Sequence, residues 1–135
     1  MSAIVFDASA LLAMLNCEPG GDMVAEAMHW GRISAVNYAE VVSYFARAGV
    51  AHQAIAGMLD PLPVYVISAD KALATLAGSL RAKTADFGLS LGDRFCLAQA
   101  LKDGLPAWTA DRAWTEVAKR VGVEVVLIRS GNARD

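Results

Sequence analysis

The stretch AIVFDASALLAML, residues 3–15, decides the fold because it contains a strand, a carboxylate and a helix in direct succession. Its apolar run 3–6 is typical of a short buried strand, and Asp7 stands where that strand gives way to a helical pattern. A second stretch, PAWTAD (106–111), shows the same succession and ends in Asp111. In parallel α/β folds the strand ends meet at one edge of the sheet, where active sites form. We therefore expect both acids at that edge.

Strand and helix patterns alternate along the whole chain, as expected for a parallel sheet covered by helices on both faces. We predict a three-layer α/β/α sandwich with a mainly parallel central sheet. A single domain would occupy residues 1–130, followed by a loose tail at 131–135. The expected strands lie at about 3–6, 32–35, 64–67, 107–110 and 123–128, and the expected helices at about 8–15, 22–30, 36–48, 51–59, 69–82, 91–103 and 111–121, with a polar connection at 83–89.

The composition is that of a folded, apolar chain, since 56% of its 135 residues are hydrophobic and 19% are charged. The net charge of −2 argues against nucleic-acid binding through bulk electrostatics alone. The charge is unevenly distributed, with a balance of −5 over residues 1–70 and +3 over residues 71–135. A basic half beside an acidic pocket would suit a polyanion, although ordinary charged helix surfaces would give the same asymmetry.

The cysteines and histidines argue against zinc chemistry. Cys17 and Cys96 stand in no CxxC motif, and His29 and His52 lie in unrelated segments. Two thiols without a disulfide framework fit a reducing compartment. The apolar N-terminal stretch lacks a basic leader and is interrupted by Asp7. We expect a cytoplasmic protein with no signal peptide and no membrane span.

Two further acids, Glu40 and Asp93, stand on predicted helices. Glu40 shares a polar stripe with Asn37, Tyr44 and Arg47 on a helix that is otherwise largely apolar, so the stripe either faces solvent or meets a partner. Asp93 has the spacing of a capping box with Ser90. The residues that follow Asp93 on the same face are apolar, and an unpaired acid is costly to bury there. We therefore favour a functional role for Asp93, with helix capping as the alternative.

Asp7 and Asp111 are also good candidates for helix N-caps. Capping and metal binding are compatible, because a carboxylate has two oxygens that accept separately. Ser9 follows Asp7 by two residues and offers a hydroxyl group that would orient it. Thr109 offers a second hydroxyl group at the end of its strand.

Four carboxylates brought to one place would repel one another and raise each other's pKa values unless a cation lies between them. A divalent ion, Mg²⁺ or Mn²⁺, is the simplest cation that would offset this repulsion. The chemistry expected of such a site is phosphodiester hydrolysis. Arg94 and Arg112 each follow a proposed ligand directly and would contact phosphate, unless they are ordinary surface residues. The expected catalytic and metal-binding residues are Asp7, Glu40, Asp93 and Asp111, supported by Ser9, Asn37 and Thr109.

Other enzyme classes lack their motifs in this sequence. Ser9 occupies the position at which a haloacid-dehalogenase-like phosphatase has a second Asp, and no phosphate-cradling glycine loop is present. The two histidines do not suit a Ser-His-Asp set. A metal-dependent DNA nuclease would use the same acids and stays open. A catalytically inert binding module, in which the acids are only helix caps, also stays open, and metal dependence distinguishes it from an enzyme.

Four segments, in order along the chain, resemble the motifs of PIN-domain ribonucleases, specifically the VapC-type toxins of bacterial toxin–antitoxin pairs. They are DASAL (7–11), SAVNYAEV (34–41), GLSLGDR (88–94) with CLA (96–98), and TAD (109–111) with Trp114. The resemblance implies that the four acids form the family's metal-binding quartet, with Ser9 and Thr109 in supporting positions. It also implies Mg²⁺ or Mn²⁺ dependence, cleavage of structured RNA, a homodimer, and a cognate VapB-type antitoxin that blocks the site.

Overall fold

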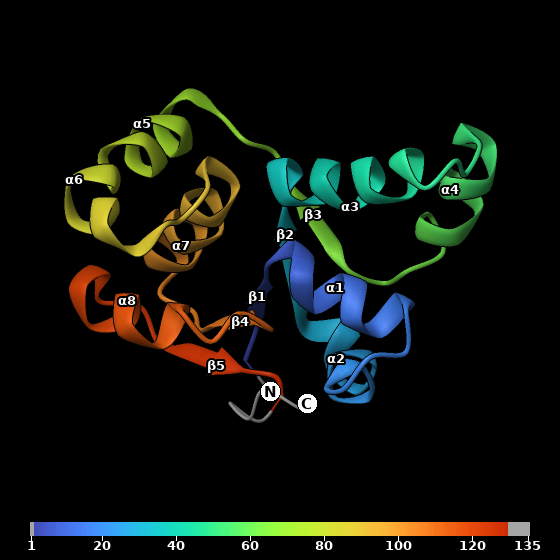
Figure 1. Ribbon diagram of the computed structural model, residues 1–135, viewed down its shortest axis with the longest axis horizontal. Helices are drawn as coiled ribbons and strands as arrows, with labels where there is room; N and C mark the ends of the chain where they lie inside the picture. Colours follow the sequence, from blue (N-terminus) through green and yellow to red (C-terminus); the bar gives the residue numbers. More distant parts are fainter. Residues whose placement is uncertain (1, 130–135) are drawn as a thin grey trace.

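The computed structural model describes residues 2–129, so the predicted tail at 131–135 lies outside the described residues. Within residues 2–129, five strands form one sheet in the order β3-β2-β1-β4-β5 (Figure 1), and each neighbouring pair is parallel. The predicted α/β/α fold with a mainly parallel sheet is therefore confirmed. The strands are short, namely β1 (Ile4–Phe6), β2 (Gly31–Ser34), β3 (Tyr65–Ile67), β4 (Ala107–Thr109) and β5 (Val125–Leu127).

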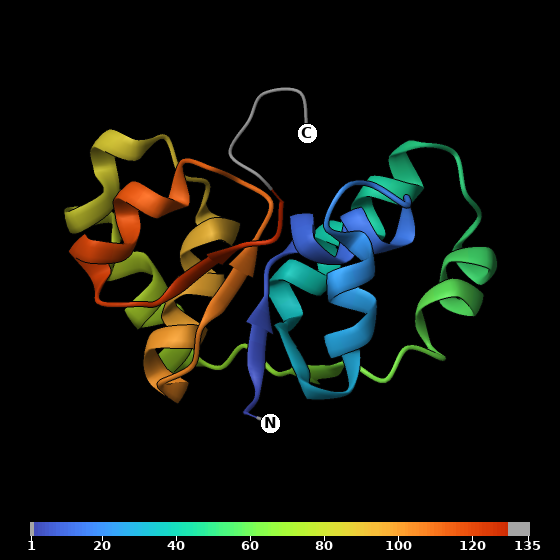
Figure 2. The same ribbon diagram turned by 90° about the horizontal axis from the view of Figure 1, so that it is seen from below.

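Helices cover both faces of the sheet, with α1–α4 gathered on one side and α5–α8 on the other (Figures 1 and 2). Successive side chains of a strand point to opposite faces. Accordingly, Ile4 and Phe6 pack into the core beneath α1–α4, and Val5 packs into the core beneath α5, α7 and α8. The helices are α1 (Ala8–Leu15), α2 (Gly21–Ala27), α3 (Ala35–Arg47), α4 (His52–Leu59), α5 (Lys71–Ser79), α6 (Arg81–Thr84), α7 (Leu91–Asp103) and α8 (Trp114–Val121), with 3₁₀ turns η1 (Met28–Trp30) and η2 (Ala85–Phe87).

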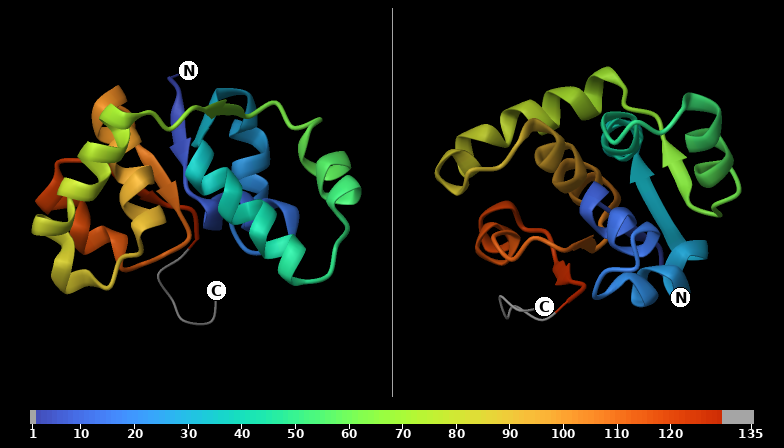
Figure 3. Two further views of the ribbon diagram at one scale, coloured as in Figure 1. Left: turned by 90° about the horizontal axis from the view of Figure 1, so that it is seen from above. Right: turned by 45° about the vertical axis from the view of Figure 1, so that its right-hand side comes forward.

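Helix α7 lies at the centre of the molecule, in contact with α5, α3 and the strands β1, β2 and β4. Most of its residues are buried, which is why its sequence lacks a continuous polar face. The chain reaches the α5–α8 layer from the α1–α4 layer along the edge of the sheet, where β3 is the edge strand (Figure 3, left). The first turn of α3 lies against the first turn of α7, because Asn37 Nδ2 donates to the backbone carbonyl of Gly92 at 2.9 Å.

The strand order reverses at β1. The chain places β2 and β3 on one side of β1 and later returns to place β4 and β5 on the other side. In the register, Phe6 of β1 pairs with Ile33 of β2 and with Trp108 of β4. Asp7 therefore follows β1 next to the carboxyl end of β4. In open α/β sheets, ligands bind in the crevice at such a reversal.

The predicted helix 111–121 begins later than expected. Helix α8 starts at Trp114, and Asp111 lies in the preceding turn rather than at the helix start. The physical reason is a local hydrogen bond, because the Oδ1 atom of Asp111 accepts from the backbone N–H of Ala113 at 2.9 Å. Such a bond to the main chain two residues on stabilises a turn in competition with helix.

Two other predicted helices are divided. The segment 69–82 forms α5 and α6 with a break after Gly78 and Ser79, which are weak helix formers. The segment predicted as a polar connection, 83–89, contains the end of α6 and the turn η2. The segment 22–30 forms α2 followed by η1.

Among the helices of residues 2–129, none combines the length and the apolar composition needed to cross a membrane.

Candidate active site

One open pocket lies at the carboxyl ends of β1 and β4. Carboxylates from four separate elements line it, together with small, apolar and aromatic side chains. The structure thus brings all four sequence-predicted acids to one place, at the reversal of the strand order. The lining residues are Asp7, Ala8, Ser9, Leu12, Glu40, Tyr44, Asp93 and Asp111.

Asp7 is the buried member of the set, with only 4% of its surface exposed. It is the N-cap of α1, and its Oδ1 atom accepts from the backbone N–H of Ala10 at 2.8 Å. The Ser9 hydroxyl lies 2.8 Å from the same oxygen and donates to it, and the Thr109 hydroxyl donates to Oδ2 at 2.6 Å. Burial raises the pKa of Asp7 from 3.8 to about 6, although these hydrogen bonds act to lower it.

Two hydroxyl groups join the start of α1 to the end of β4. Thr109 Oγ1 accepts from the backbone N–H of Asp111 at 3.0 Å while it donates to Asp7. Ser9 Oγ accepts from the backbone N–H of Ala110 at 2.9 Å. These bonds fix the main chain of Asp111 relative to the carboxylate of Asp7, so the two acids are positioned as a unit.

Asp93 and Asp111 each use a carboxylate oxygen locally. In α7, Asp93 Oδ2 accepts from the backbone N–H of Ser90 at 2.9 Å, and Ser90 Oγ accepts from the backbone N–H of Asp93 at 3.1 Å. The predicted capping box is therefore present, and it places the Asp93 carboxylate on the pocket wall. Asp111 is solvent-exposed at the mouth of the pocket. Both acids keep a second oxygen that accepts no hydrogen bond from residues 2–129.

Glu40 reaches the pocket from α3. Its Oε1 atom accepts from Asn37 Nδ2 at 2.8 Å, and the same Asn37 nitrogen donates to the backbone carbonyl of Gly92 in α7 at 2.9 Å. Asn37 is buried and Glu40 is half-buried, so the predicted polar stripe meets protein at the start of this helix, whereas its later members Tyr44 and Arg47 are exposed. The Asn37 amide therefore connects Glu40 to α7, the helix that carries Asp93.

The donor chemistry of the pocket fits a hard divalent cation. Carboxylate and hydroxyl oxygens are the ligands that Mg²⁺ and Mn²⁺ prefer. No three His, Cys, Asp or Glu side chains within residues 2–129 converge closely enough to form a complete ligand cluster. Mg²⁺ usually keeps several water molecules when it binds to proteins and needs few protein ligands. The nearby Cys96 thiol is no competing ligand, because burial, followed by the charges of Asp7, Asp93 and Glu40, raises its pKa well above 9.0.

The two arginines proposed as phosphate contacts do not line the pocket. Arg94 is buried, and its Nε atom donates to Thr84 Oγ1 at 2.8 Å, so the prediction of a phosphate contact at this position is wrong. One residue along a helix is a rotation of about 100°, which turns Arg94 from the pocket toward α6. Arg112 is exposed in the turn before α8, and its role stays a prediction.

Sequence reasoning missed some residues of the site. Tyr44 shares the predicted polar stripe with Glu40 and lines the same pocket, although it was not predicted to be a site residue. Gly92 was missed as well, and no local pattern marks a glycine in the first turn of a helix as a contact of a distant acid.

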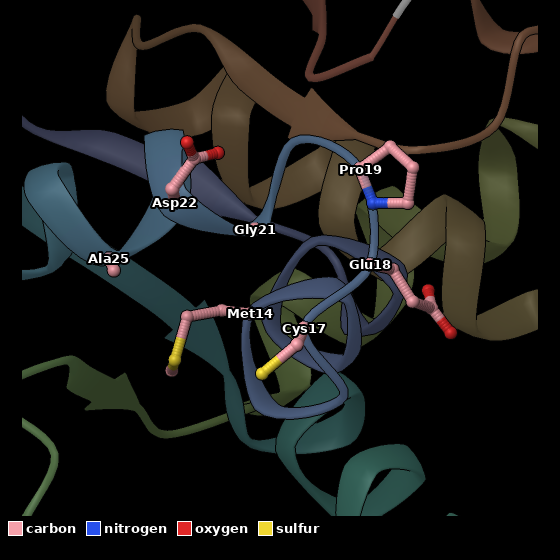
Figure 4. A pocket seen from close by; sticks show the side chains of 7 residues that line it. All are labelled: Met14, Cys17, Glu18, Pro19, Gly21, Asp22 and Ala25. Carbon is pink, nitrogen blue, oxygen red and sulfur yellow. The ribbon is translucent and has the colours of Figure 1, made fainter.

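A second hollow lies between the end of α1 and the start of α2 (Figure 4). It is separate from the four acids, and its lining is mainly apolar. The exposed Cys17 contributes to it. The lining residues are Met14, Cys17, Glu18, Pro19, Gly21, Asp22 and Ala25.

Comparison with known proteins gives a family match and several structural matches. The profile of the PIN domain matches residues 4–120. Similar solved structures include DNA-bound VapBC from Salmonella typhimurium, with a TM-score of 0.71 and 18% identity over 93% of this chain and 98% of that chain. A toxin–antitoxin complex from Klebsiella pneumoniae has a TM-score of 0.70 and 21% identity over 96% of this chain and 99% of that chain.

A third similar structure is VapBC2 from Rickettsia felis bound to a promoter DNA fragment. Its TM-score is 0.64 at 13% identity, over 92% of this chain and 97% of that chain. At these identities the likeness concerns the fold. A comparison with curated protein sequences found no match.

Proposed function

The chain belongs to the PIN-domain family, a family of nucleases, and on that premise we propose that it is a VapC-type toxin that cleaves structured RNA as a metal-dependent endoribonuclease. The single observation that carries the proposal is the gathering of four carboxylates on one pocket at the carboxyl ends of β1 and β4. A pocket with this excess of negative charge needs a cation before a phosphodiester can enter it.

Asp7, Glu40, Asp93 and Asp111 would hold Mg²⁺ or Mn²⁺. A divalent ion bound there supplies charge neutralisation for the scissile phosphate and activation of water for hydrolysis. Asp7 receives hydrogen bonds from Ser9, Ala10 and Thr109, which hold its carboxylate in one orientation. Asp111 is exposed, and its second carboxylate oxygen would hold the ion or a water molecule bound to it.

The partners follow from the same proposal. The Salmonella typhimurium and Klebsiella pneumoniae structures are described as VapBC and as a toxin–antitoxin complex. We accordingly propose a cognate VapB-type antitoxin, a homodimer and a cytoplasmic location for this chain. The DNA in the neighbouring structures belongs to those complexes.

The test is cleavage of structured RNA and of duplex DNA by the purified chain in Mn²⁺, in Mg²⁺ and in EDTA. The key variant is Asp93→Asn, because Asn keeps an accepting oxygen for the helix cap and removes only the charge. Asp86→Asn is the matched control, since Asp86 is exposed in η2 and does not line the pocket.

Discrete RNA fragments that require a divalent metal, persist with Asp86→Asn and vanish with Asp93→Asn would establish the function. Cleavage of DNA alone would make the protein a DNA nuclease. Absence of any cleavage and of Mn²⁺ binding by calorimetry would favour an inert binding module and overturn the proposal.

A further inference from the structure

Gly92 leaves room for the carboxylate of Glu40. A Cβ atom added at Gly92 would overlap that carboxylate, at 2.6 Å from Cδ and 2.7 Å from Oε1. Real Cβ atoms do not approach other atoms this closely, so Glu40 lies where it does because position 92 carries no side chain. Gly92 has no positive φ angle, so its backbone does not require glycine.

The other tightly packed glycines have structural neighbours. The atom nearest to an added Cβ at each of those positions belongs to the backbone or to the ring of a core phenylalanine, whereas the three nearest atoms at Gly92 all belong to one pocket acid. The structural positions are Gly20, Gly21 and Gly31.

Asn37 holds the Glu40 carboxylate in the space that the absent side chain of Gly92 leaves. Its Nδ2 atom donates both to Glu40 Oε1 and to the Gly92 carbonyl, at 2.8 and 2.9 Å. The reversed amide would point Oδ1 at two acceptor oxygens, so this orientation is fixed by the chemistry of the partners. Asn37 Oδ1 has no hydrogen-bond partner within residues 2–129, which shows that the two donated bonds decide the orientation.

The first turn of α7 is also an electrostatically suitable place for the Glu40 carboxylate. Gly92 is two residues after the N-cap Ser90 of this thirteen-residue helix. The amino end of a helix carries a partial positive charge, which favours a carboxylate close to its backbone. Only glycine allows the carboxylate this close, because any side chain would keep it at a distance.

We propose that Gly92 is a positioning residue, whose missing side chain sets the location of the Glu40 carboxylate on the pocket and thereby the affinity of the pocket for a divalent cation. The effect on cation affinity rests on the proposed function, because a misplaced Glu40 carboxylate would hold the cation less well. The placement itself rests on the contacts of Gly92, Asn37 and Glu40 alone.

The test compares Gly92→Ala with Gly78→Ala. Gly78 is also helical, and a Cβ atom there meets nothing within 4 Å, so it controls for the gain in helix propensity. The three atoms nearest to the methyl group introduced by Gly92→Ala all belong to the far end of the flexible Glu40 side chain, which can move away, so both variants should melt at or above the wild-type temperature. Mn²⁺ affinity by calorimetry should fall roughly tenfold in Gly92→Ala only, the loss typical of disturbed supporting groups.

A Glu40→Gln background separates direct from indirect effects. If Gly92 acts through Glu40, adding Gly92→Ala to Glu40→Gln should change Mn²⁺ affinity by less than about twofold, since the coupled position is already lost. Unchanged Mn²⁺ affinity in Gly92→Ala, or a clear drop in its melting temperature, would overturn the inference.

A readout without metal keeps this inference distinct from the proposed function. The side-chain carboxylate signal of Glu40 in ¹³C-resolved NMR reports the surroundings of this carboxylate in EDTA. It should move in Gly92→Ala, with loss of the bond from Asn37, and stay in place in Gly78→Ala. If the wild type neither binds Mn²⁺ nor cleaves RNA, the proposed function fails, and the Glu40 signal still decides whether Gly92 positions this carboxylate.

Discussion

Asp7→Asn should stabilise the metal-free protein at neutral pH while it abolishes RNA cleavage. Burial raises the pKa of Asp7 from 3.8 to about 6. At 1.36 kcal/mol per pKa unit, the ionised carboxylate costs the folded state about 3 kcal/mol at pH 7.5. Asn removes this cost, but its amide has only one accepting oxygen, so either the Thr109 hydroxyl or the Ala10 N–H loses its acceptor at any pH, at about 1.5 kcal/mol. The variant should therefore be more stable than the wild type by about 1.5 kcal/mol.

The advantage of Asn should reverse at low pH. Between pH 3.8 and about 6 the folded protein holds a proton on Asp7 that the unfolded chain has lost. The contribution of Asp7 to the stability of the wild type is therefore greatest below pH 3.8, and it falls as the pH rises to about 6. At pH 4.0 the burial cost has dropped to about 0.5 kcal/mol, so Asp7→Asn should be the less stable protein by about 1 kcal/mol.

Urea unfolding in EDTA at pH 7.5 and pH 4.0 measures both differences. At pH 7.5 the expected gain corresponds to a rise of about 6 °C in melting temperature for a domain of this size. Excess Mn²⁺ should stabilise the wild type and leave Asp7→Asn unchanged, because the variant lacks a ligand. A variant that is less stable than the wild type by the same amount at both pH values would refute the reasoning, because Asp7 would then be a favourable charge in the fold.

Three further outcomes are expected. Mn²⁺ affinity of the wild type, measured by calorimetry, should be about tenfold weaker at pH 5.0 than at pH 7.5, because Asp7 must lose its proton to bind a cation; an affinity independent of pH would exclude Asp7 as a ligand. Thr109→Val should destabilise the protein by about 1–3 kcal/mol in urea unfolding, since it leaves Asp7 Oδ2 and the Asp111 N–H without this partner, and an unchanged midpoint would contradict that role. Arg94→Met should leave RNA cleavage intact and change the unfolding free energy by less than about 2 kcal/mol, because Arg94 is buried without an ion-pair partner among residues 2–129; lost cleavage at unchanged stability would restore its predicted phosphate contact.

Local sequence patterns contain enough information for the sheet and for the convergence of the acids. The apolar run before Asp7 and the helical pattern after it predict β1 and the bounds of α1, because both periodicities are local. Parallel strands connected by helices place all strand-to-helix junctions at one edge, so Asp7 and Thr109 had to meet there. Asp7 and Thr109 are separated by about a hundred positions, yet the local patterns at the two strand ends are sufficient to predict that they meet.

The sequence does not determine which face of a helix such as α7 points toward the pocket. Arg94 follows Asp93 directly and was expected to share its surroundings, but in α7 it faces α6 and donates to Thr84. Helix α7 is buried on nearly all sides, so its sequence contains no polar face from which to infer orientation. The contact between Gly92 and Glu40 is of the same kind, because it depends on how closely α3 and α7 approach each other.

The capping role and the metal-binding role of these acids support each other. Asp7 caps α1, Asp93 completes the capping box of α7, and Asp111 closes the turn before α8. A cap fixes a carboxylate at the amino end of a helix, and helices that follow parallel strands begin at the edge where ligands bind. One oxygen of a carboxylate can serve the cap while the other faces the pocket. In this fold, the hydrogen bonds that cap α1 and α7 hold Asp7 and Asp93 on the pocket, the turn before α8 holds Asp111, and Asn37 holds Glu40.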